Sequence, residues 1–220
     1  RIYYKVAEEN KEMQVMQTDT NGTTSFYYTN PGGIMFDIDA KNDLIIDSLD
    51  VEFSGAATDW FKVYYREGTY VGHETTIADW ALLDSITVTS LATPSFTGVK
   101  LTKGLYIPAG STYGICVIAA NGVYYVNGTF AATVEDSNMV VNQGAGCDLF
   151  ASFLSPRFFK GQIHYSVRNV DEIAPGAQTG SNAGNARGYC FQATKDFRIV
   201  GAMVPTDVPG HKGKVRKQLA

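Results

Sequence analysis

The stretch that decides the fold class is Trp60-Phe61-Lys62-Val63-Tyr64-Tyr65. Phe61, Val63 and Tyr65 alternate in it with Trp60, Lys62 and Tyr64. Successive side chains of an extended chain point to opposite faces, so a period of two is typical of a strand with one buried face. We therefore predict a half-buried strand at residues 60–65.

The same alternation continues on both sides of this stretch. It recurs at residues 44–53, 86–88, 113–118 and 162–165, and no stretch of a dozen residues keeps the 3.6 period of a helix. Turn-forming pairs such as Asn121-Gly122 separate these segments. Many short strands joined by tight turns are typical of two antiparallel sheets packed face to face.

The size of this region refines the prediction. Residues 24–167 are more numerous than the residues of an immunoglobulin domain. We therefore predict an all-β, antiparallel β-sandwich that is jelly-roll-like or elaborated immunoglobulin-like, with strand-like terminal extensions.

The composition agrees with this fold class and argues against several partners. The 220 residues suffice for a large domain with its own core, since 45% of them are hydrophobic and only 18% are charged. A net charge of −4 gives no general attraction for nucleic acid or anionic lipid. No apolar run reaches the length of a membrane-spanning helix. We therefore expect no nucleic-acid partner and no membrane span.

The two ends of the chain differ from its middle. Residues 1–23 hold two apolar segments around a polar one, which predicts an extended arm or a hairpin, and residues 168–187 have the composition of a polar linker. Residues 188–220 contain a hairpin-like segment and a basic tail. The apolar positions of that segment match those of residues 33–51, which suggests a partial repeat of the first two strands of the sandwich. A chance similarity of two amphipathic hairpins is the alternative.

Strand-like ends need a sheet to join, because an isolated hairpin cannot bury its own apolar face and is marginal in water. They pack on the preceding sandwich, complete a sheet in another subunit, or continue into residues outside this chain. The residues expected to carry such an assembly are the apolar ones of both ends: Ile2, Tyr4, Val6, Phe191, Phe197, Ile199 and Val204.

Three segments of the middle region resemble a known kind of domain. They are residues 63–80, 105–114 and 153–165, with the motifs Tyr70-Val71-Gly72-His73-Glu74, Ile107-Pro108-Ala109-Gly110 and Ser155-Pro156-Arg157-Phe158. They resemble an uncharacterised β-sandwich domain of secreted and cell-surface proteins of Bacteroidota-like bacteria. The resemblance covers residues 24–167 and implies a sandwich fold and an extracellular location. It implies no catalytic residues.

No constellation of residues predicts catalysis. Ser155 lacks the glycines of a nucleophile elbow, and His73, His164 and His211 show no metal-ligand spacing. We therefore expect no enzyme activity and no obligatory cofactor. The best metal candidates are carboxylates that suit calcium, although solvated strand and turn positions explain them more simply. They are Asp37, Asp39 and Asp43.

Cysteines and processing features add a few expectations. Cys116, Cys147 and Cys190 have no metal-like spacing, so we predict buried, small apolar residues first, and their odd number leaves at least one unpaired. Asn21 and Asn127 begin Asn-X-Thr sequons, which chance explains equally well. The start at Arg1 suggests a processed product or an excerpt of a longer precursor.

Two functions are compatible with these features. The first is an extracellular structural or adhesive subunit that forms filaments or a surface layer by sharing strands between copies, with itself as the main partner. The second is an accessory module of a larger secreted protein that binds a surface polysaccharide. Aromatic rings stack on sugars, and Trp60, Tyr64 and Trp80 are the candidates, although most aromatics of such a sandwich belong to its core.

Overall fold

The computed structural model describes residues 2–6, 13–18, 25–26, 29–127, 133–168, 171–173 and 197–202. The chain forms two compact units. The sandwich unit comprises Glu12–Val167, and the terminal unit comprises Arg1–Lys11 together with Arg168–Ala220. Two distant parts of the sequence therefore belong to one unit.

The smaller sheet of the sandwich unit has four antiparallel strands. In sheet order they are β2 (Gln14–Gln17), β15 (Gly161–Val167), β5 (Leu44–Glu52) and β8 (Phe96–Ile107). β2 lies within the predicted terminal arm, yet it pairs with β15 at the edge of this sheet. The reason is its alternation, because Met16 is buried while Val15 is exposed. The predicted boundary at residue 24 is therefore too late.

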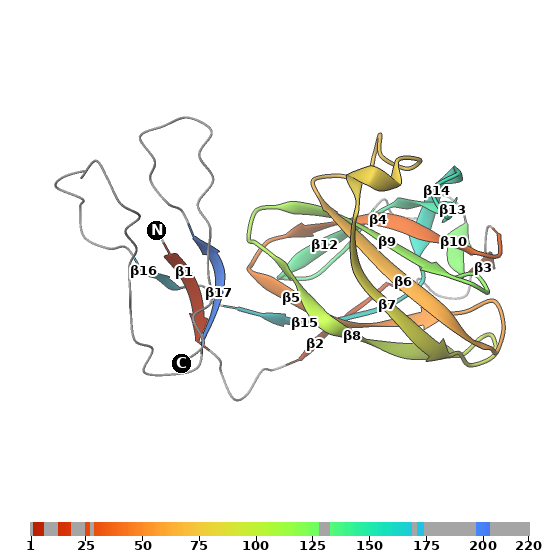
Figure 1. Cartoon of the computed structure of the whole chain (residues 1–220), viewed down its shortest axis with the longest axis horizontal. Helices are drawn as coiled ribbons and strands as arrows, with labels where there is room; N and C mark the ends of the chain where they lie inside the picture. The colour runs from red at the N-terminus through yellow and green to blue at the C-terminus, as the bar shows by residue number, and fades with distance from the viewer. Residues whose placement is uncertain are drawn as a thin grey trace, which may run out of the picture. The chain divides into compact units, whose positions relative to one another are not determined.

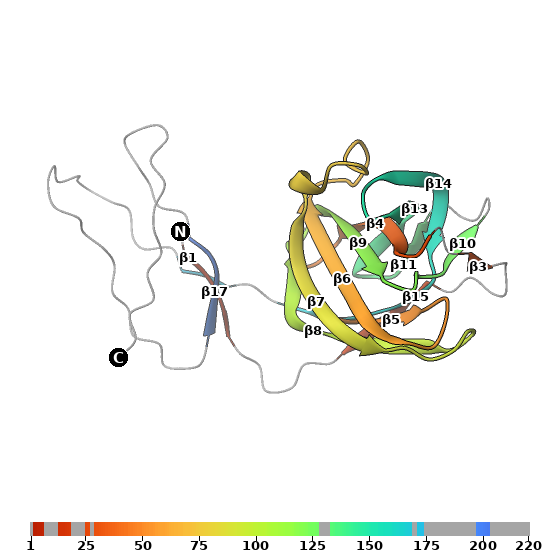
Figure 2. The same ribbon diagram turned by 45° about the vertical axis from the view of Figure 1, so that its right-hand side comes forward.

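The larger sheet has ten strands, and all their pairings are antiparallel (Figures 1 and 2). Its main path is β3 (Ser25–Phe26), β10 (Tyr125–Asn127), β14 (Ser152–Phe159), β13 (Gly144–Asp148), β4 (Gly32–Ala40), β9 (Thr112–Ala119), β6 (Thr58–Glu67) and β7 (Ala81–Thr89). Off this path, β12 (Met139–Asn142) pairs with β4 and with β11 (Thr133–Glu135). At one margin β7 runs beside β8 of the smaller sheet.

The core of the sandwich unit lies between these two sheets, as the alternation predicts. Phe61 and Val63 of β6 are buried in it, and Tyr65 packs against it. From β4, the ring of Phe36 stacks on that of Phe159 with 4.7 Å between their centroids. The all-β, antiparallel sandwich predicted from the sequence is therefore confirmed. The one helical element of the described residues is a single 3-10 turn, η1 (Ile77–Asp79).

The terminal unit contains a three-stranded antiparallel sheet, here called the end sheet. Its strands are β16 (Asp171–Ile173), β1 (Ile2–Val6) and β17 (Phe197–Ala202), with β1 in the middle. Of the two alternatives for residues 1–23, the hairpin does not form: β1 is an extended strand that pairs with β16 and β17 of the same chain. The stretch predicted as a linker contains β16. Hydrogen bonding of the backbone to a distant segment outweighs the local polar composition.

Candidate functional site

The chain leaves the sandwich unit twice at the same place. β2 begins at Gln14 and β15 ends at Val167, and Gln14 lies opposite Tyr165 in their antiparallel pairing. The connection to β1 and the connection to β16 therefore start side by side on two neighbouring strands. Residues 7–13 separate β1 from β2, and such a segment spans at most roughly 25 Å.

A group of polar side chains fixes this exit point, and we call it the anchor network: Gln14, Asp136, Asn138 and Tyr165. The Tyr165 hydroxyl lies 2.6 Å from Asp136 Oδ2, and Asn138 Nδ2 donates to Tyr165 Oη at 3.0 Å and to Gln14 Oε1 at 2.7 Å. Burial, followed by the bond to Asp136, raises the pKa of Tyr165 to about 12. The hydroxyl therefore stays protonated and donates to the carboxylate.

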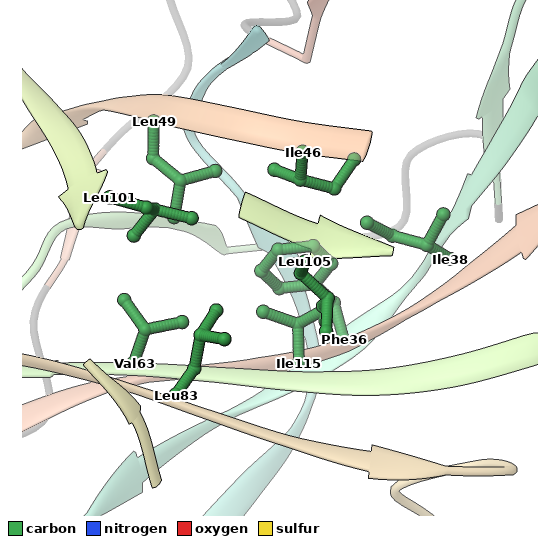
Figure 3. A pocket seen from close by; sticks show the side chains of 9 residues that line it. All are labelled: Phe36, Ile38, Ile46, Leu49, Val63, Leu83, Leu101, Leu105 and Ile115. Carbon is green, nitrogen blue, oxygen red and sulfur yellow. The ribbon is translucent and has the colours of Figure 1, made fainter. Parts of the chain in front are cut away.

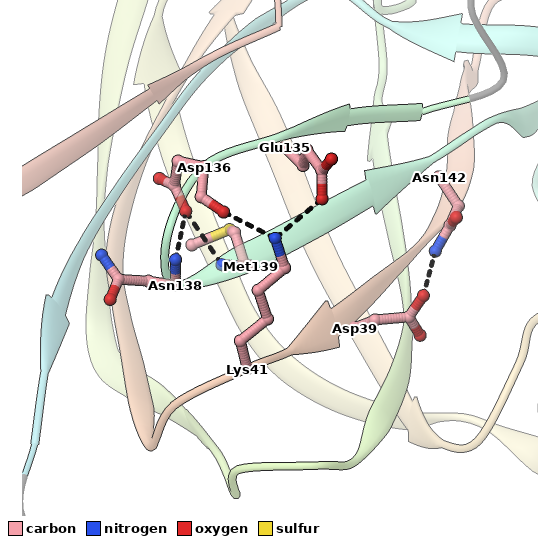
Figure 4. A network of polar contacts seen from close by, with 7 residues as sticks. All are labelled: Asp39, Lys41, Glu135, Asp136, Asn138, Met139 and Asn142. Atoms are coloured by element: carbon pink, nitrogen blue, oxygen red, sulfur yellow. Dashed lines mark hydrogen bonds and ion pairs between the residues drawn. The ribbon is translucent and has the colours of Figure 1, made fainter.

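The turn between β11 and β12 contains Asp136 and Asn138, and further hydrogen bonds hold this turn in place (Figure 4). Asp136 Oδ1 accepts bonds from the backbone N–H groups of Asn138 at 2.7 Å and Met139 at 2.9 Å. Lys41 Nζ lies 2.7 Å from Glu135 Oε2 and donates to the Asp136 carbonyl at 2.7 Å. The loop after β4, the β11–β12 turn and the two exit strands are thus joined by polar contacts.

The end sheet brings together residues predicted to act in assembly. In the register of β1 with β17, Tyr4 lies opposite Ile199 and Val6 opposite Phe197, while Ile2 lies opposite Ala202. On its other edge, β1 pairs with β16 from Ile2 to Tyr4. Of the remaining predicted assembly residues, Phe191 and Val204 lie outside the described residues.

The three calcium candidates each accept hydrogen bonds from a different part of the chain. Asp37 accepts from Thr69 Oγ1 at 2.6 Å and Tyr70 N at 2.8 Å, and Asp43 Oδ1 accepts from Tyr106 Oη and from Ala109 N at 2.9 Å each. Asp39 accepts from Thr112 Oγ1 at 2.5 Å and from Asn142 Nδ2 at 2.7 Å. Within the described residues, no three His, Cys, Asp or Glu side chains come together in a metal-binding group. The structure therefore does not bring the predicted calcium ligands together.

A second cluster of buried side chains covers the outer face of the larger sheet, opposite the core. We call it the outer cluster, and its members are Met35, Tyr64, Tyr70, Trp80, Cys116, Ile118, Ala145, Cys147 and Phe150. Asp37 holds the loop over this face through Thr69 and Tyr70. Burial, the largest cause, raises the pKa of Asp37, although the bonds from Thr69 and Tyr70 oppose the shift.

The three aromatic residues proposed for sugar stacking differ in exposure. Tyr64 and Trp80 are buried, and their rings lie 5.2 Å and 5.7 Å from the ring of Phe150. Trp60 is half-buried, with Lys62 Nζ 4.8 Å from its ring centroid. Only Trp60 of the three therefore offers surface to a ligand in this structure.

Two of the three cysteines are fully buried, as predicted. Cys116 Sγ and Cys147 Sγ lie 3.9 Å apart as free thiols in the outer cluster. Burial, followed by the contact with Cys147, raises the pKa of the Cys116 thiol. Cys190 and the sequon residue Asn21 lie outside the described residues, and Asn127 is exposed at the end of β10.

The histidines pair with carboxylates on separate surfaces. His73 Nδ1 lies 2.6 Å from Asp79 Oδ2, and the His73 carbonyl accepts a bond from Trp80 Nε1 at 2.9 Å. His164 Nε2 lies 3.0 Å from Asp50 Oδ2 on the smaller sheet. The first pair closes the loop before β7, and the second joins β15 to β5. His211 lies outside the described residues.

A small cavity lies inside the sandwich core, near the margin where β7 and β8 meet (Figure 3). Its volume is about 10 Å³, near the lower limit for one water molecule. Only apolar side chains line it: Phe36, Ile38, Ile46, Leu49, Val63, Leu83, Leu101, Leu105 and Ile115. It is a packing defect rather than a ligand site.

The anchor network could not be found by reading the sequence. Asp136-Ser137-Asn138 has the composition of a turn that caps its own backbone, which is the one local indication. The partners Gln14 and Tyr165 are far away in the chain, so no spacing rule joins them.

Comparison with protein-family models finds no match for this chain, and neither does comparison with curated proteins. Among the described residues, no helix has both the length and the apolar character that crossing a bilayer requires.

Proposed function

We propose that this protein is a non-catalytic structural or adhesive subunit of the cell exterior, and that copies join by exchanging strand β1. One observation carries the proposal: β1 is the middle strand of the end sheet, whereas both of its neighbours come from the other end of the chain. Because β16 and β17 are joined only through β1 in the strand order, the end sheet requires a β1 strand from some copy.

A neighbouring copy supplies the same strand equally well. The register of β1 against β17 involves residues 2–6 and 197–202, so the same pairs form whether β1 belongs to the same chain or to another. Domain swapping of an identical element creates few new contacts and is a low-cost route to assembly. The residue pairs that form between two copies are therefore the same pairs that form within one chain.

The connections favour exchange over a permanently closed chain. The connection to β1 and the connection to β16 start side by side, at Gln14 and Val167. Only residues 7–13 separate β1 from β2. Short hinge segments favour domain swapping. The anchor network fixes β2, where the connection from β1 ends, so β1 is the element that changes partner.

The mode of exchange decides the product. If each copy donates β1 to the next copy and receives one from the previous copy, the contact is head-to-tail and gives an open filament. Reciprocal exchange between two copies gives a closed dimer instead. We favour the filament because the donated strand and its acceptor lie at opposite ends of the sequence.

Two features support a non-catalytic, extracellular role. The histidine–carboxylate pairs lie on separate surfaces, and the cavity in the core is too small for a substrate. The resemblance to secreted sandwich domains, which the all-β fold matches in class, supports the location.

The test is assembly of truncated chains. Deletion of residues 1–6 removes β1 but leaves β2 in the sandwich unit, and deletion of residues 205–220 is the matched control. We expect the full chain and the control to form a concentration-dependent ladder of species in analytical ultracentrifugation, with filaments in negative-stain electron microscopy. The chain without β1 should stay monomeric. Ladder formation without β1, or a full chain that is monomeric at every concentration, would refute strand exchange.

A second candidate is an accessory module that binds a surface polysaccharide. Trp60 favours it, because this residue is only partly buried and has Lys62 Nζ over its ring. Binding to an insoluble polysaccharide that Trp60→Ala abolishes, and Leu82→Ala on the neighbouring strand preserves, would support the module. No binding to any glycan on an array would exclude it.

A further inference from the structure

Three sulfur-bearing residues belong to the outer cluster on the larger sheet. Cys116 lies on β9 and Cys147 on β13, and both strands pair with β4. Met35 of β4 lies directly opposite Cys116, and Gly33, two residues earlier on the same face, lies opposite Cys147. All three sulfur-bearing side chains are fully buried members of the outer cluster.

The two thiols are poorly placed for a disulfide. β4 separates their strands, and strands two positions apart in a sheet are about 9.5 Å apart. A disulfide needs Cα atoms within about 7 Å of each other. The thiols nevertheless lie 3.9 Å apart across β4, where Gly33 is the register partner of Cys147.

This separation matches two sulfur ligands of one metal ion. A metal–sulfur bond of about 2.3 Å at a tetrahedral angle places two sulfur atoms about 3.8 Å apart. Thiolate and thioether ligands select soft ions such as Cu(I). The aromatic rings of Tyr64, Trp80 and Phe150 keep the surroundings apolar, which disfavours hard, strongly hydrated cations.

We propose that Cys116, Cys147 and Met35 form a binding site for one Cu(I) ion. Binding releases two protons to water, because the ion takes Cys116 and Cys147 as thiolates and Met35 as a neutral thioether. The complex then carries one net negative charge. Copper remains Cu(I) throughout, so the step needs no oxidant or reductant.

The site has two consequences for its behaviour. Binding displaces thiol protons, so the apparent affinity for the ion rises as the pH increases. The outer cluster covers the sulfur atoms, so the metal enters while the loop that Asp37 holds is open, or during folding.

The test is anaerobic refolding of the full chain with Cu(I) and a competing Cu(I) chelator, followed by native mass spectrometry. We expect one ion per chain in the parent and in Cys190→Ser. Cys116→Ser and Cys147→Ser should lose the ion, and Met35→Leu should weaken binding at least tenfold while keeping the circular dichroism spectrum. An ultraviolet sulfur-to-copper charge-transfer band should appear in the parent and decrease in the same order.

Two outcomes would overturn the site. In the first, the parent chain takes up no Cu(I) during refolding; in the second, Cys190→Ser abolishes the uptake. Equal affinity of the parent and Met35→Leu would remove the thioether from the site, and a Cys116–Cys147 disulfide in peptide mapping of the protein refolded without metal would assign the thiols to a cross-link instead. Since none of these measurements depends on assembly, failure here leaves strand exchange untouched.

Discussion

The hydroxyl of Tyr165 lies 2.6 Å from Oδ2 of Asp136, and this contact ties the exit strand β15 to the β11–β12 turn. Removing the hydroxyl leaves a carboxylate oxygen and the Asn138 amide without this partner. We predict that Tyr165→Phe lowers the free energy of unfolding by about 1–3 kcal/mol in urea titrations. In a double-mutant cycle with Asp136→Asn, the loss of stability in the double variant should be smaller than the sum of the losses in the two single variants. Full additivity would show that the contact does not matter.

The tyrosines also predict behaviour in base. Burial is the largest cause that raises the pKa of Tyr113 and of Tyr165 to about 12 each. Above pH 10 the unfolded chain loses these protons while the folded chain keeps them, so stability falls as the pH rises toward 12. We expect Tyr165→Phe to reduce the slope of the unfolding free energy between pH 10 and 12. An unchanged slope would contradict the assignment.

Asp37 affects stability in acid and the loop that contains Tyr70. Its pKa is raised in the folded chain, so the folded chain binds this proton more tightly than the unfolded chain. The contribution of Asp37 to stability therefore falls as the pH rises from its unfolded pKa of 3.8 through its folded pKa. Asp37→Asn should flatten this part of the stability profile. Asp37→Ala should also speed amide exchange at Tyr70, whose N–H donates to the carboxylate. Equal exchange in parent and variant would show that another contact holds the loop.

Glu52 and Lys160 form a largely buried ion pair, with 2.6 Å between Oε2 and Nζ. Removing one partner leaves a buried charge, so Lys160→Met should cost about 3–5 kcal/mol in chemical denaturation. Combining it with Glu52→Gln should recover much of that loss. The matched control is Glu135→Gln, which removes the charge that Glu135 brings to its exposed pair with Lys41 and should cost under about 1 kcal/mol. Similar costs at the two sites would contradict the burial of Glu52.

The alternation of apolar residues was sufficient to predict the sheets. Phe61 and Val63 are in the core as their spacing predicts, because a period of two on a strand follows from backbone geometry alone. The burial of Tyr64 on the opposite face was left open, since a local pattern does not tell whether a loop covers the outer face. Here the segment that includes Tyr70 and Trp80 covers it.

The end sheet and the sulfur site depend on long-range register. Nothing near Val6 indicates that Phe197 lies opposite it, and the predicted linker gave no sign of β16. Similarly, Cys116 and Cys147 come close together through the pairing of β9 and β13 with the same strand, β4. Sequence reasoning identified the apolar terminal residues but could not pair them.

Covalent trapping of the end sheet tests strand exchange most directly. Lys5 and Arg198 are register partners, so Lys5→Cys with Arg198→Cys places two thiols face to face in a Cys190→Ser background. After mild oxidation of the assembled protein, non-reducing denaturing electrophoresis should show a ladder of linked chains, while each single variant gives nothing larger than a dimer. A doubly substituted chain that is cross-linked only within itself, with no ladder at any concentration, would contradict the exchange of β1.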